Sequence, residues 1–397
     1  MKVPASGAVL GKEEKEAMHL VVESGWLTAG KVNDEFERRL GAYTGIKHVR
    51  TCNSGSSANL LAVAAMVEAG YWKAGDEIIT TACGFPTTVN PLLLYGLVPV
   101  FVDVELGTYN TTQEMFDYAG KVDGAMMAHT LGNPFRLYLD VPTIEDCCDA
   151  LGSQWIIDDG FGRLHTGSQG KISTCSFFPA HHITTGEGGA VFSNDHELIR
   201  KIESIRDWGR DCYCQPGQNG TCGKRFSQQH GDLPYGFDHK YTFTHLGFNL
   251  KLNEVGAACG VEQMKKLPDF VATRKANFAL LWELLEDLQD KIILPSATEG
   301  STPSWFGFPI TIREHGLRDQ MQRFLAEREV DSRLLFGGNL TKQPYMKGRK
   351  YRVSGSLENT DKVMNDSFWI GLHPQLSAVH LAYSAEMIRL FFGGNYD

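Results

Sequence analysis

The chain has 397 residues, of which 42% are hydrophobic, and this is enough apolar material for a large core and for two domains. Its 47 acidic and 38 basic side chains give a formal charge of −9 without any long Lys/Arg cluster, which argues against a nucleic-acid or anionic-membrane surface and favours a small-molecule partner. The N-terminus lacks the apolar run of a signal peptide and no run of about 18 apolar residues occurs, so we expect a cytoplasmic location.

The first elements in chain order are predicted to be helical. Residues 11–45 carry apolar positions at roughly helical spacing, and Gly41 and Gly45 are stop signals. A short strand from Val49 then runs into a Ser/Gly turn and an Ala/Leu-rich helix, and the unpaired N–H groups at the start of such a helix suit a phosphate. An ordinary Ser N-cap would give the same pattern. The candidate phosphate residues are Ser54, Gly55, Ser56 and Ser57.

Strands and helices then alternate, which predicts a mainly parallel sheet with helices on its faces. Ligands of such sheets collect at the carboxyl ends of the strands. Asp146 stands at such an end, directly before Cys147, Cys148 and Asp149, and its carboxylate could pair with a protonated ring nitrogen or serve as a helix N-cap. The expected strands cover 76–81, 98–104, 123–129 and 141–145, and a helix is expected near 87–95.

A Gly-rich loop between two apolar strands, within residues 176–195, is the strongest candidate for a chemical centre. Gly186, Gly188 and Gly189 allow close backbone approach to a ligand, and His181 and His182 lie just upstream. A proton-transfer site is one interpretation of this pattern. A tight turn with a surface histidine is the other.

The loop at 210–225 follows a predicted helix at 196–208 and holds three cysteines, Cys212, Cys214 and Cys222. The loop is too rich in Gly, Pro and Asn to bury thiols as core residues, and the chain's nine cysteines lack the context of a disulfide framework. A thiolate metal site is therefore predicted, for zinc or iron–sulfur, with free thiols as the alternative. Cys148 is the candidate for the fourth ligand.

The C-terminal third is predicted to form a smaller α/β domain. Residues 253–290 read as two helices, the second of which should link the domains. A strand at 305–312, a helix at 317–327 and closing helices within 375–393 follow. We predict a large cofactor-binding domain with the cysteine loop at 1–265 and a small domain at 266–397.

The order of these motifs resembles the sugar aminotransferase family (DegT/DnrJ/EryC1/StrS type) of fold-type I pyridoxal-phosphate enzymes, which act on nucleotide-linked keto sugars. The resemblance rests on the turn at 53–57, Asp146, SFFPAHH…GEGG at 176–189 and FNLKLNEVGAACG at 248–260. It implies an α/β, aspartate aminotransferase-like fold with a mainly parallel central sheet and a smaller C-terminal α/β domain. The lysine that anchors the cofactor in this family is His181 here, which points to the family's 3-dehydrase branch.

The stretches EDCCDALG, RDWGRDCYC and TCGKRF strengthen the likeness to that branch, which uses pyridoxamine 5′-phosphate (or pyridoxal 5′-phosphate), a [2Fe-2S] cluster and an NADH-dependent flavin or iron–sulfur reductase. The resemblance makes His181 the general base of a C3 dehydration. Gly55, Ser56 and Ser176 would bind the cofactor phosphate, and Phe85, Asp146 and Asp149 would lie against its ring. Asn249 would reach the neighbouring subunit of a homodimer. The cluster ligands would be Cys148, Cys212, Cys214 and Cys222.

Three features depart from the pattern of that branch. Phe178 stands where a Tyr is expected, the segment 132–143 looks shortened as if a helix were missing, and 153–171 looks several residues longer. Two other functions stay open: an aminotransferase with a displaced lysine, and a non-catalytic relative that only binds nucleotide sugars.

Overall fold

A twisted eight-stranded sheet forms the centre of the computed structural model, which describes residues 1–157 and 162–394. Neighbouring strands pair in parallel except at β9, which runs against both β8 and β1. The predicted α/β class with a mainly parallel sheet is therefore confirmed. In sheet order the strands are β1 (His48–Cys52), β9 (Gly189–Ser193), β8 (Ile172–Ser176), β5 (Thr143–Asp146), β4 (Gly124–Ala128), β2 (Glu77–Thr81), β3 (Val98–Val102) and β14 (Arg352–Val353).

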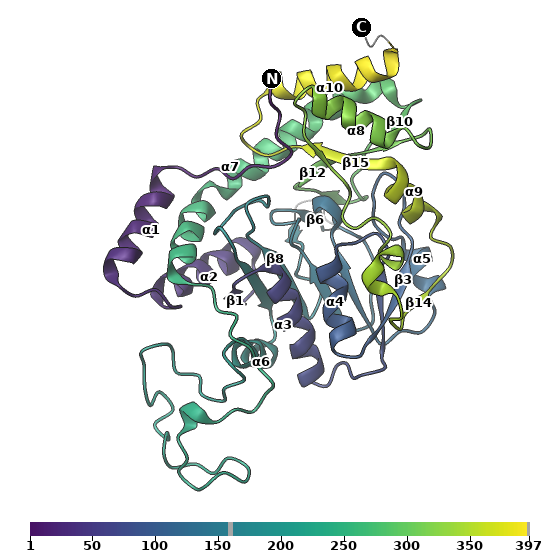
Figure 1. The fold of residues 1–397 in the computed structure, drawn as a ribbon. Helices are drawn as coiled ribbons and strands as arrows, with labels where there is room; N and C mark the ends of the chain where they lie inside the picture. The colour runs from purple at the N-terminus through teal and green to yellow at the C-terminus, as the bar shows by residue number, and fades with distance from the viewer. Residues whose placement is uncertain (158–161, 395–397) are drawn as a thin grey trace.

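Helices bury both faces of this sheet (Figure 1), which explains why its strands are apolar runs without clear alternation. On one face, α3 (Gly55–Glu68) packs against β8 and α6 (His196–Arg206), and α4 (Pro86–Leu94) lies beside α3. On the other face, Phe36 and Leu40 of α2 (Lys31–Thr44) join Leu267 of α7 in a core with strands β1, β8 and β9. Helix α1 (Lys12–Ser24) packs outside, against α7.

Helix α7 (Glu254–Leu285) is continuous over 32 residues, so the expectation of two helices in this region is wrong. Pro268 lies inside it, at an exposed position where water can satisfy the carbonyl group that loses its partner. Glu254, in the first turn of α7, accepts hydrogen bonds from the backbone N–H groups of Gly30, Val32 and Asn33 at 2.7–3.0 Å. This buried carboxylate ties the start of α7 to the start of α2.

A second, four-stranded sheet forms the smaller α/β layer near both termini (Figure 1), and its core joins α7 to α10. Helix α7 passes position 265 without a break, and β14 adds a late segment of the chain to the large sheet. The division at 265/266 thus stays a prediction. The elements are β10 (Ile292–Ile293), β12 (Gly307–Ile312), β15 (Ser367–Gly371), β13 (Ser332–Arg333), α8 (Arg318–Glu327), α9 (Glu358–Asp366) and α10 (Ala378–Gly393).

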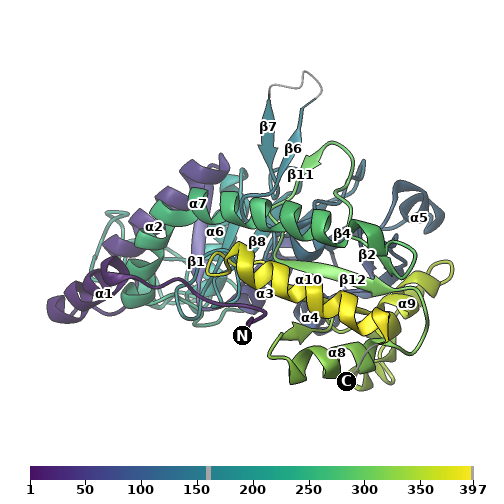
Figure 2. The same cartoon turned by 90° about the horizontal axis from the view of Figure 1, so that it is seen from above.

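The two segments whose lengths depart from the expected pattern line one common groove. Residues 133–142, all described, contain no helix, and the short helix α5 (Gln113–Tyr118) precedes β4. Strands β6 (Gln154–Ile156) and β7 (Arg163–His165) form a hairpin that projects from the body and pairs with β11 (Ser301–Thr302), as Figure 2 shows. Positions 158–161 of the lengthened segment lie outside the described residues.

A long connection between α6 and α7, residues 207–253, extends away from the sheet (Figure 1) and is here called the arm. It contains one short 3-10 helix, η2 (His239–Tyr241). The other 3-10 helices are η1 (Thr130–Gly132), η3 (Glu286–Leu288), η4 (Leu340–Lys342) and η5 (Pro344–Met346). Among the described residues, no helix combines the length and the apolar character needed to cross a membrane.

Candidate active site

A cavity of about 510 Å³ opens at the carboxyl ends of the parallel strands. Nine of the predicted site residues line it: Ser54, Gly55, Ser56, Phe85, Asp146, Cys148, Asp149, Ser176 and His181. A larger groove of about 1050 Å³ runs between the 135–143 segment and the β6–β7 hairpin, but it contains none of the predicted residues. The smaller cavity is therefore the candidate active site.

The start of α3 forms one wall of this cavity. Ser54 is the N-cap, and its hydroxyl accepts a hydrogen bond from the backbone N–H of Ser57 at 3.0 Å. A Cβ atom at Gly55 would lie 2.5 Å from Cβ of Ser176 and 3.1 Å from Sγ of Cys148, so only glycine fits there. Hydroxyl groups and helical N–H groups thus meet at one point, which suits a phosphate.

Asp146, at the end of β5, is buried and held by three neutral donors. Its Oδ2 accepts from Asn59 Nδ2 and Thr88 Oγ1, both at 2.8 Å, and its Oδ1 accepts from the backbone N–H of Cys148 at 3.1 Å. No cation pairs with it among the described residues. A carboxylate so placed can accept a proton-bearing ring nitrogen from a ligand in the cavity.

His181 stands in the loop between β8 and β9 and is half-buried. Its Nδ1 lies 3.2 Å from Oδ1 of Asp149, within ion-pair distance, and its ring packs on Phe306 at 5.3 Å between centroids. The buried guanidinium of Arg274, on α7, donates to the carbonyl oxygens of Phe306 at 2.8 Å and of His181 at 3.5 Å. Asp149 and Phe306 therefore lie against the ring of His181, and Arg274 holds its backbone.

His182 has a different role from its neighbour. It is 2% exposed, does not line the cavity, and its Nε2 donates to the carbonyl oxygen of Ser304 at 2.8 Å. Burial lowers the pKa of His182 well below its ordinary value, so it stays neutral and structural. Of the two adjacent histidines, His181 is therefore the one that stays a candidate for proton transfer.

The glycines of this loop bring it against the phosphate turn. Gly186 adopts a φ of +85°, which favours glycine. A Cβ atom at Gly189 would lie 2.4 Å from the carbonyl oxygen of Ser54 and 2.7 Å from the backbone nitrogen of Gly55. The close approach explains why a Gly-rich sequence follows the histidines.

Two aromatic rings complete this part of the cavity. Phe85, the N-cap residue of α4, is 51% exposed and presents a ring that could cover a flat ligand. Phe178 is 49% exposed and brings no hydroxyl group to the position where a Tyr was expected.

The remaining predicted residues lie on the arm, outside this cavity. Asn249 is exposed and its backbone bridges to Asp207 at the base of the arm. Cys212 and Cys214 line a separate hollow of about 210 Å³ beside α6. Within one chain the structure therefore does not place Asn249, Cys212 or Cys214 in the cavity that contains Cys148.

Two of the three arm cysteines, Cys214 and Cys222, nevertheless have a lowered pKa, which favours the thiolate form of a metal ligand, whereas burial raises the pKa of Cys212. Burial opposes the charge of Cys214, but hydrogen bonds from Thr221 and Cys212 together with nearby Lys240 lower the pKa of Cys214 to about 7. The backbone N–H of Lys224, followed by His239, lowers the pKa of Cys222. Burial raises the pKa of Cys148, in contrast.

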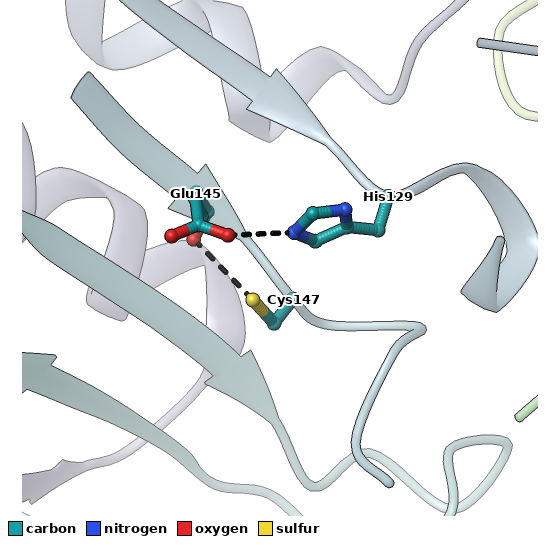
Figure 3. A group of neighbouring side chains, drawn as sticks. All are labelled: His129, Glu145 and Cys147. Carbon is teal, nitrogen blue, oxygen red and sulfur yellow. Dashed lines mark hydrogen bonds and ion pairs between the residues drawn. The ribbon is translucent and has the colours of Figure 1, made fainter. Parts of the chain in front are cut away.

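Two groups of possible metal-ligating side chains were not predicted from the sequence. On the arm, His239 Nε2 lies 2.6 Å from Asp211 Oδ2, His230 completes the group, and Cys222 Sγ lies 3.5 Å from His239 Nδ1. The second group is His129, Glu145 and Cys147 (Figure 3). Neither group includes Cys148, Cys212, Cys214 or Cys222.

The group in Figure 3 is structural, because its polar atoms are already engaged. Glu145 lies 3.0 Å from His129 Nε2 and accepts from the backbone N–H groups of Gly167, Gln169 and Gly170 at 2.6–2.9 Å. Although burial opposes its charge, these partners hold the pKa of Glu145 below its ordinary value. His129 lines the cavity, so its contact with Glu145 fixes this part of the cavity wall.

The comparison with known protein families agrees with this geometry. The model of the DegT/DnrJ/EryC1/StrS aminotransferase family matches residues 8–389. The chain belongs to this family. The membership predicted from the motif order is confirmed, and so is the fold expected from it.

Individual relatives within the DegT/DnrJ/EryC1/StrS family are similar over nearly the whole chain. The lipopolysaccharide biosynthesis protein RfbH of Salmonella typhimurium is 50% identical over 99% of this chain and 92% of its own length. The dTDP-4-dehydro-2,6-dideoxy-D-glucose 3-dehydratase of Saccharopolyspora spinosa is 44% identical over 97% of this chain and 86% of its own. The solved structure of the E. coli GDP-4-keto-6-deoxy-D-mannose-3-dehydratase with bound hydrated PLP superimposes with a TM-score of 0.85 at 27% identity, covering 98% of this chain and 99% of that one.

Proposed function

We propose that the protein dehydrates a nucleotide-linked 4-keto-6-deoxyhexose at C3, using pyridoxamine 5′-phosphate, and that a [2Fe-2S] cluster and an NADH-dependent reductase complete the deoxygenation. A substrate of the CDP-4-keto-6-deoxyglucose type and a 3,6-dideoxysugar product for lipopolysaccharide O-antigen or related glycans fit the similarity to RfbH and to two sugar 3-dehydratases. One observation carries the proposal: no lysine lines the cavity among the described residues, whereas His181 lines it beside Asp149.

The cavity fits the cofactor in several respects. The start of α3, with Ser56 and Ser176, offers donors to a phosphate, and the Gly55 position has no room for a side chain. Asp146 offers a buried carboxylate to a ring nitrogen, and Phe85 offers a ring face. When bound, pyridoxamine phosphate supplies a primary amine for the sugar's ketone and a ring that withdraws electrons.

The chain's own residues would then control the protons. His181 would remove a proton from the C4′ carbon of the cofactor as general base, because the unperturbed pKa of histidine, about 6.5, lies near neutral pH. Asp149 would hold the ring of His181 in place and stabilise its protonated form. Asp146 would keep the ring nitrogen protonated, and Phe306 would exclude water beside His181.

The arm supports the electron-transfer part of the proposal. Cys214 and Cys222 have lowered pKa values, and thiolates are the ligands that iron–sulfur clusters require. With Cys148 in the cavity and the others on the arm, a four-cysteine site requires the arm to fold back or to reach the cavity of another subunit. Cys148, Cys212, Cys214 and Cys222 would hold the cluster, whose chemistry is single-electron transfer.

A homodimer is part of the same proposal. Several large apolar side chains of the arm are exposed, among them Phe226 at 61%, Tyr235 at 74% and Leu246 at 75%. Monomeric proteins rarely leave so much apolar surface in one segment, so a partner subunit is proposed to cover it. Asn249, exposed at the base of the arm, would then bind the cofactor phosphate of that subunit.

Borohydride treatment tests the assignment of His181. The protein loaded with pyridoxal phosphate should release the cofactor on denaturation after reduction, because no lysine in the described part of the chain lines the cavity. A His181→Lys variant is the matched control, in which mass spectrometry should find the cofactor fixed to the chain. Covalent attachment to a lysine of the unaltered protein would contradict the proposal and favour an ordinary aminotransferase.

A further inference from the structure

Arg333 is the one lysine or arginine that lines the cavity among the described residues. It belongs to β13 of the small sheet, where its backbone pairs with Trp369 of β15. Trp369 Nε1 donates to the carbonyl oxygen of Leu334 at 3.0 Å, which fixes the strand beside Arg333. These contacts fix the backbone from which the Arg333 side chain extends.

The guanidinium of Arg333 has capacity to bind an anion. Its Nη1 donates to the carbonyl oxygen of Ser332 at 2.8 Å, and within residues 1–157 and 162–394 no carboxylate forms an ion pair with it. The side chain is exposed, so its charge is not satisfied by the protein. An arginine in this state can present its planar fork to a phosphate or a carboxylate.

The cofactor phosphate does not account for this cation. The phosphate turn lies at the start of α3 on the large sheet, where Gly55, Ser56 and Ser176 meet, whereas Arg333 belongs to the small sheet. The cavity thus offers two anion-binding positions on two different sheets. A cofactor with one phosphate fills the first position only.

Aromatic rings separate Arg333 from the centre of proton transfer. The ring of His181 packs on Phe306 at 5.3 Å, and Phe306 packs on Trp369 at 5.2 Å. Trp369 is the backbone partner of Arg333. The contacts that lead from the base to Arg333 thus run over two rings and one strand pair, so Arg333 is placed to bind a charged group that does not itself react.

We propose that Arg333 binds the diphosphate of a nucleotide-linked sugar and so orients the sugar toward His181, an inference that rests on the function proposed above. The α-carboxylate of an amino-acid donor such as glutamate has related chemistry. That carboxylate, however, must lie next to the carbon that loses its proton. Because the rings of Phe306 and Trp369 stand in the contact path between His181 and Arg333, the diphosphate is favoured as the ligand of Arg333.

Calorimetric titration of the pyridoxamine-phosphate-loaded protein with CDP tests this assignment. Arg333→Ala should weaken CDP binding about tenfold or more, because it removes charge-assisted hydrogen bonds. Arg333→Lys should restore part of the affinity, since it keeps the charge and loses the fork. Cytidine, which lacks the diphosphate, should bind the unaltered protein and the Ala variant equally. Arg136→Ala, which removes an exposed arginine from the other groove, should change nothing.

Several results would overturn the proposal. Equal CDP affinity of the unaltered protein and Arg333→Ala would remove Arg333 from the substrate site while leaving the proposed function intact. A loss confined to cofactor affinity would assign Arg333 to the cofactor phosphate, and a loss confined to glutamate binding would assign it to an amino donor. If the unaltered protein binds none of CDP, GDP and dTDP, the nucleotide-sugar substrate class itself fails.

Discussion

Adjacent histidines in this chain have opposite surroundings. His181 is half-buried beside Asp149 in the cavity, whereas His182 is fully buried and donates to Ser304. The sequence offers two identical side chains before a Gly-rich turn and does not show which of them the turn will bury. Only the path of the loop between β8 and β9 decides it, and that path depends on the close approach of Gly189 to Ser54 and Gly55, which are distant in sequence.

His373 should make the stability of the protein depend on pH. It is buried, donates to the carbonyl oxygen of Pro4 at 3.1 Å, and burial lowers its pKa to about 4. In the unfolded chain its pKa is about 6.5, so between pH 6.5 and pH 4 the unfolded state binds a proton that the folded state does not. The free energy of unfolding should therefore fall as the pH falls through this window, by at most about 3 kcal/mol.

Urea denaturation of His373→Gln at pH 7.5 and pH 5 measures this contribution. The variant should lose less stability on acidification than the unaltered protein. His19→Gln is the control, because the side chain of His19 is 71% exposed. An identical pH dependence in the unaltered protein and His373→Gln would show that His373 is not a source of acid sensitivity.

Single site residues could be predicted where a motif surrounds them. Asp146 is predictable from its place at a strand end, and Gly55 from the Ser/Gly turn that precedes a helix. Both residues line the cavity. Arg333 and Trp369 line the same cavity but come from β13 and β15, which carry no local motif. Their place depends on strand pairing within the small sheet, which is a tertiary property.

At the scale of elements, the arm should contribute electrons and not proton transfer. Cys212→Ser and Cys214→Ser should lose the iron–sulfur absorption and form no 3,6-dideoxy product when NADH and a competent reductase are supplied. Hydrogen exchange at the cofactor's C4′ carbon should persist, because His181 and Asp149 lie in a cavity that neither cysteine lines.

The control for these variants is Cys259→Ser, in α7, whose thiol donates to the carbonyl oxygen of Thr184 as a hydroxyl could. It should keep both exchange and product formation. Loss of exchange together with product in the arm variants, while they stay folded and bind cofactor, would mean that the arm shapes the catalytic cavity.

Long periodic elements were predicted well, and short paired ones were not. The helices α2, α6 and α8 and the strands of the large sheet other than β14 follow from periodicity and apolar runs. The two-residue strands β10, β11, β13 and β14 have no such signal, because distant partners define them. The expected division of 253–290 into two helices is not seen, and α7 accommodates Pro268 at an exposed position.

At the scale of the whole molecule, the proposed homodimer should share its active sites. Asn249 lies outside the cavity of its own chain, so its predicted contact with a cofactor phosphate requires a second subunit. Mixing Asn249→Ala subunits with His181→Asn subunits puts both defects in one site of each heterodimer and leaves the other site whole. Random pairing should restore roughly a quarter of the unaltered activity, since half of the dimers are mixed.

Subunit exchange must be verified by mass spectrometry of the intact dimers. Each variant alone should be inactive or nearly so, which gives the baseline. No recovery in proven heterodimers would contradict the shared-site picture.

The central claim is that His181 moves the proton at C4′ without a lysine anchor, and hydrogen exchange tests it most directly. The protein loaded with pyridoxamine phosphate is incubated in D2O with CDP-4-keto-6-deoxyglucose, without reductase. The mass of the released cofactor is then measured by mass spectrometry. We expect one deuterium at C4′ with the unaltered protein and none with His181→Asn, although the variant still binds the cofactor. Deuterium incorporation at the same rate in His181→Asn would contradict the account, because another residue would then be the base.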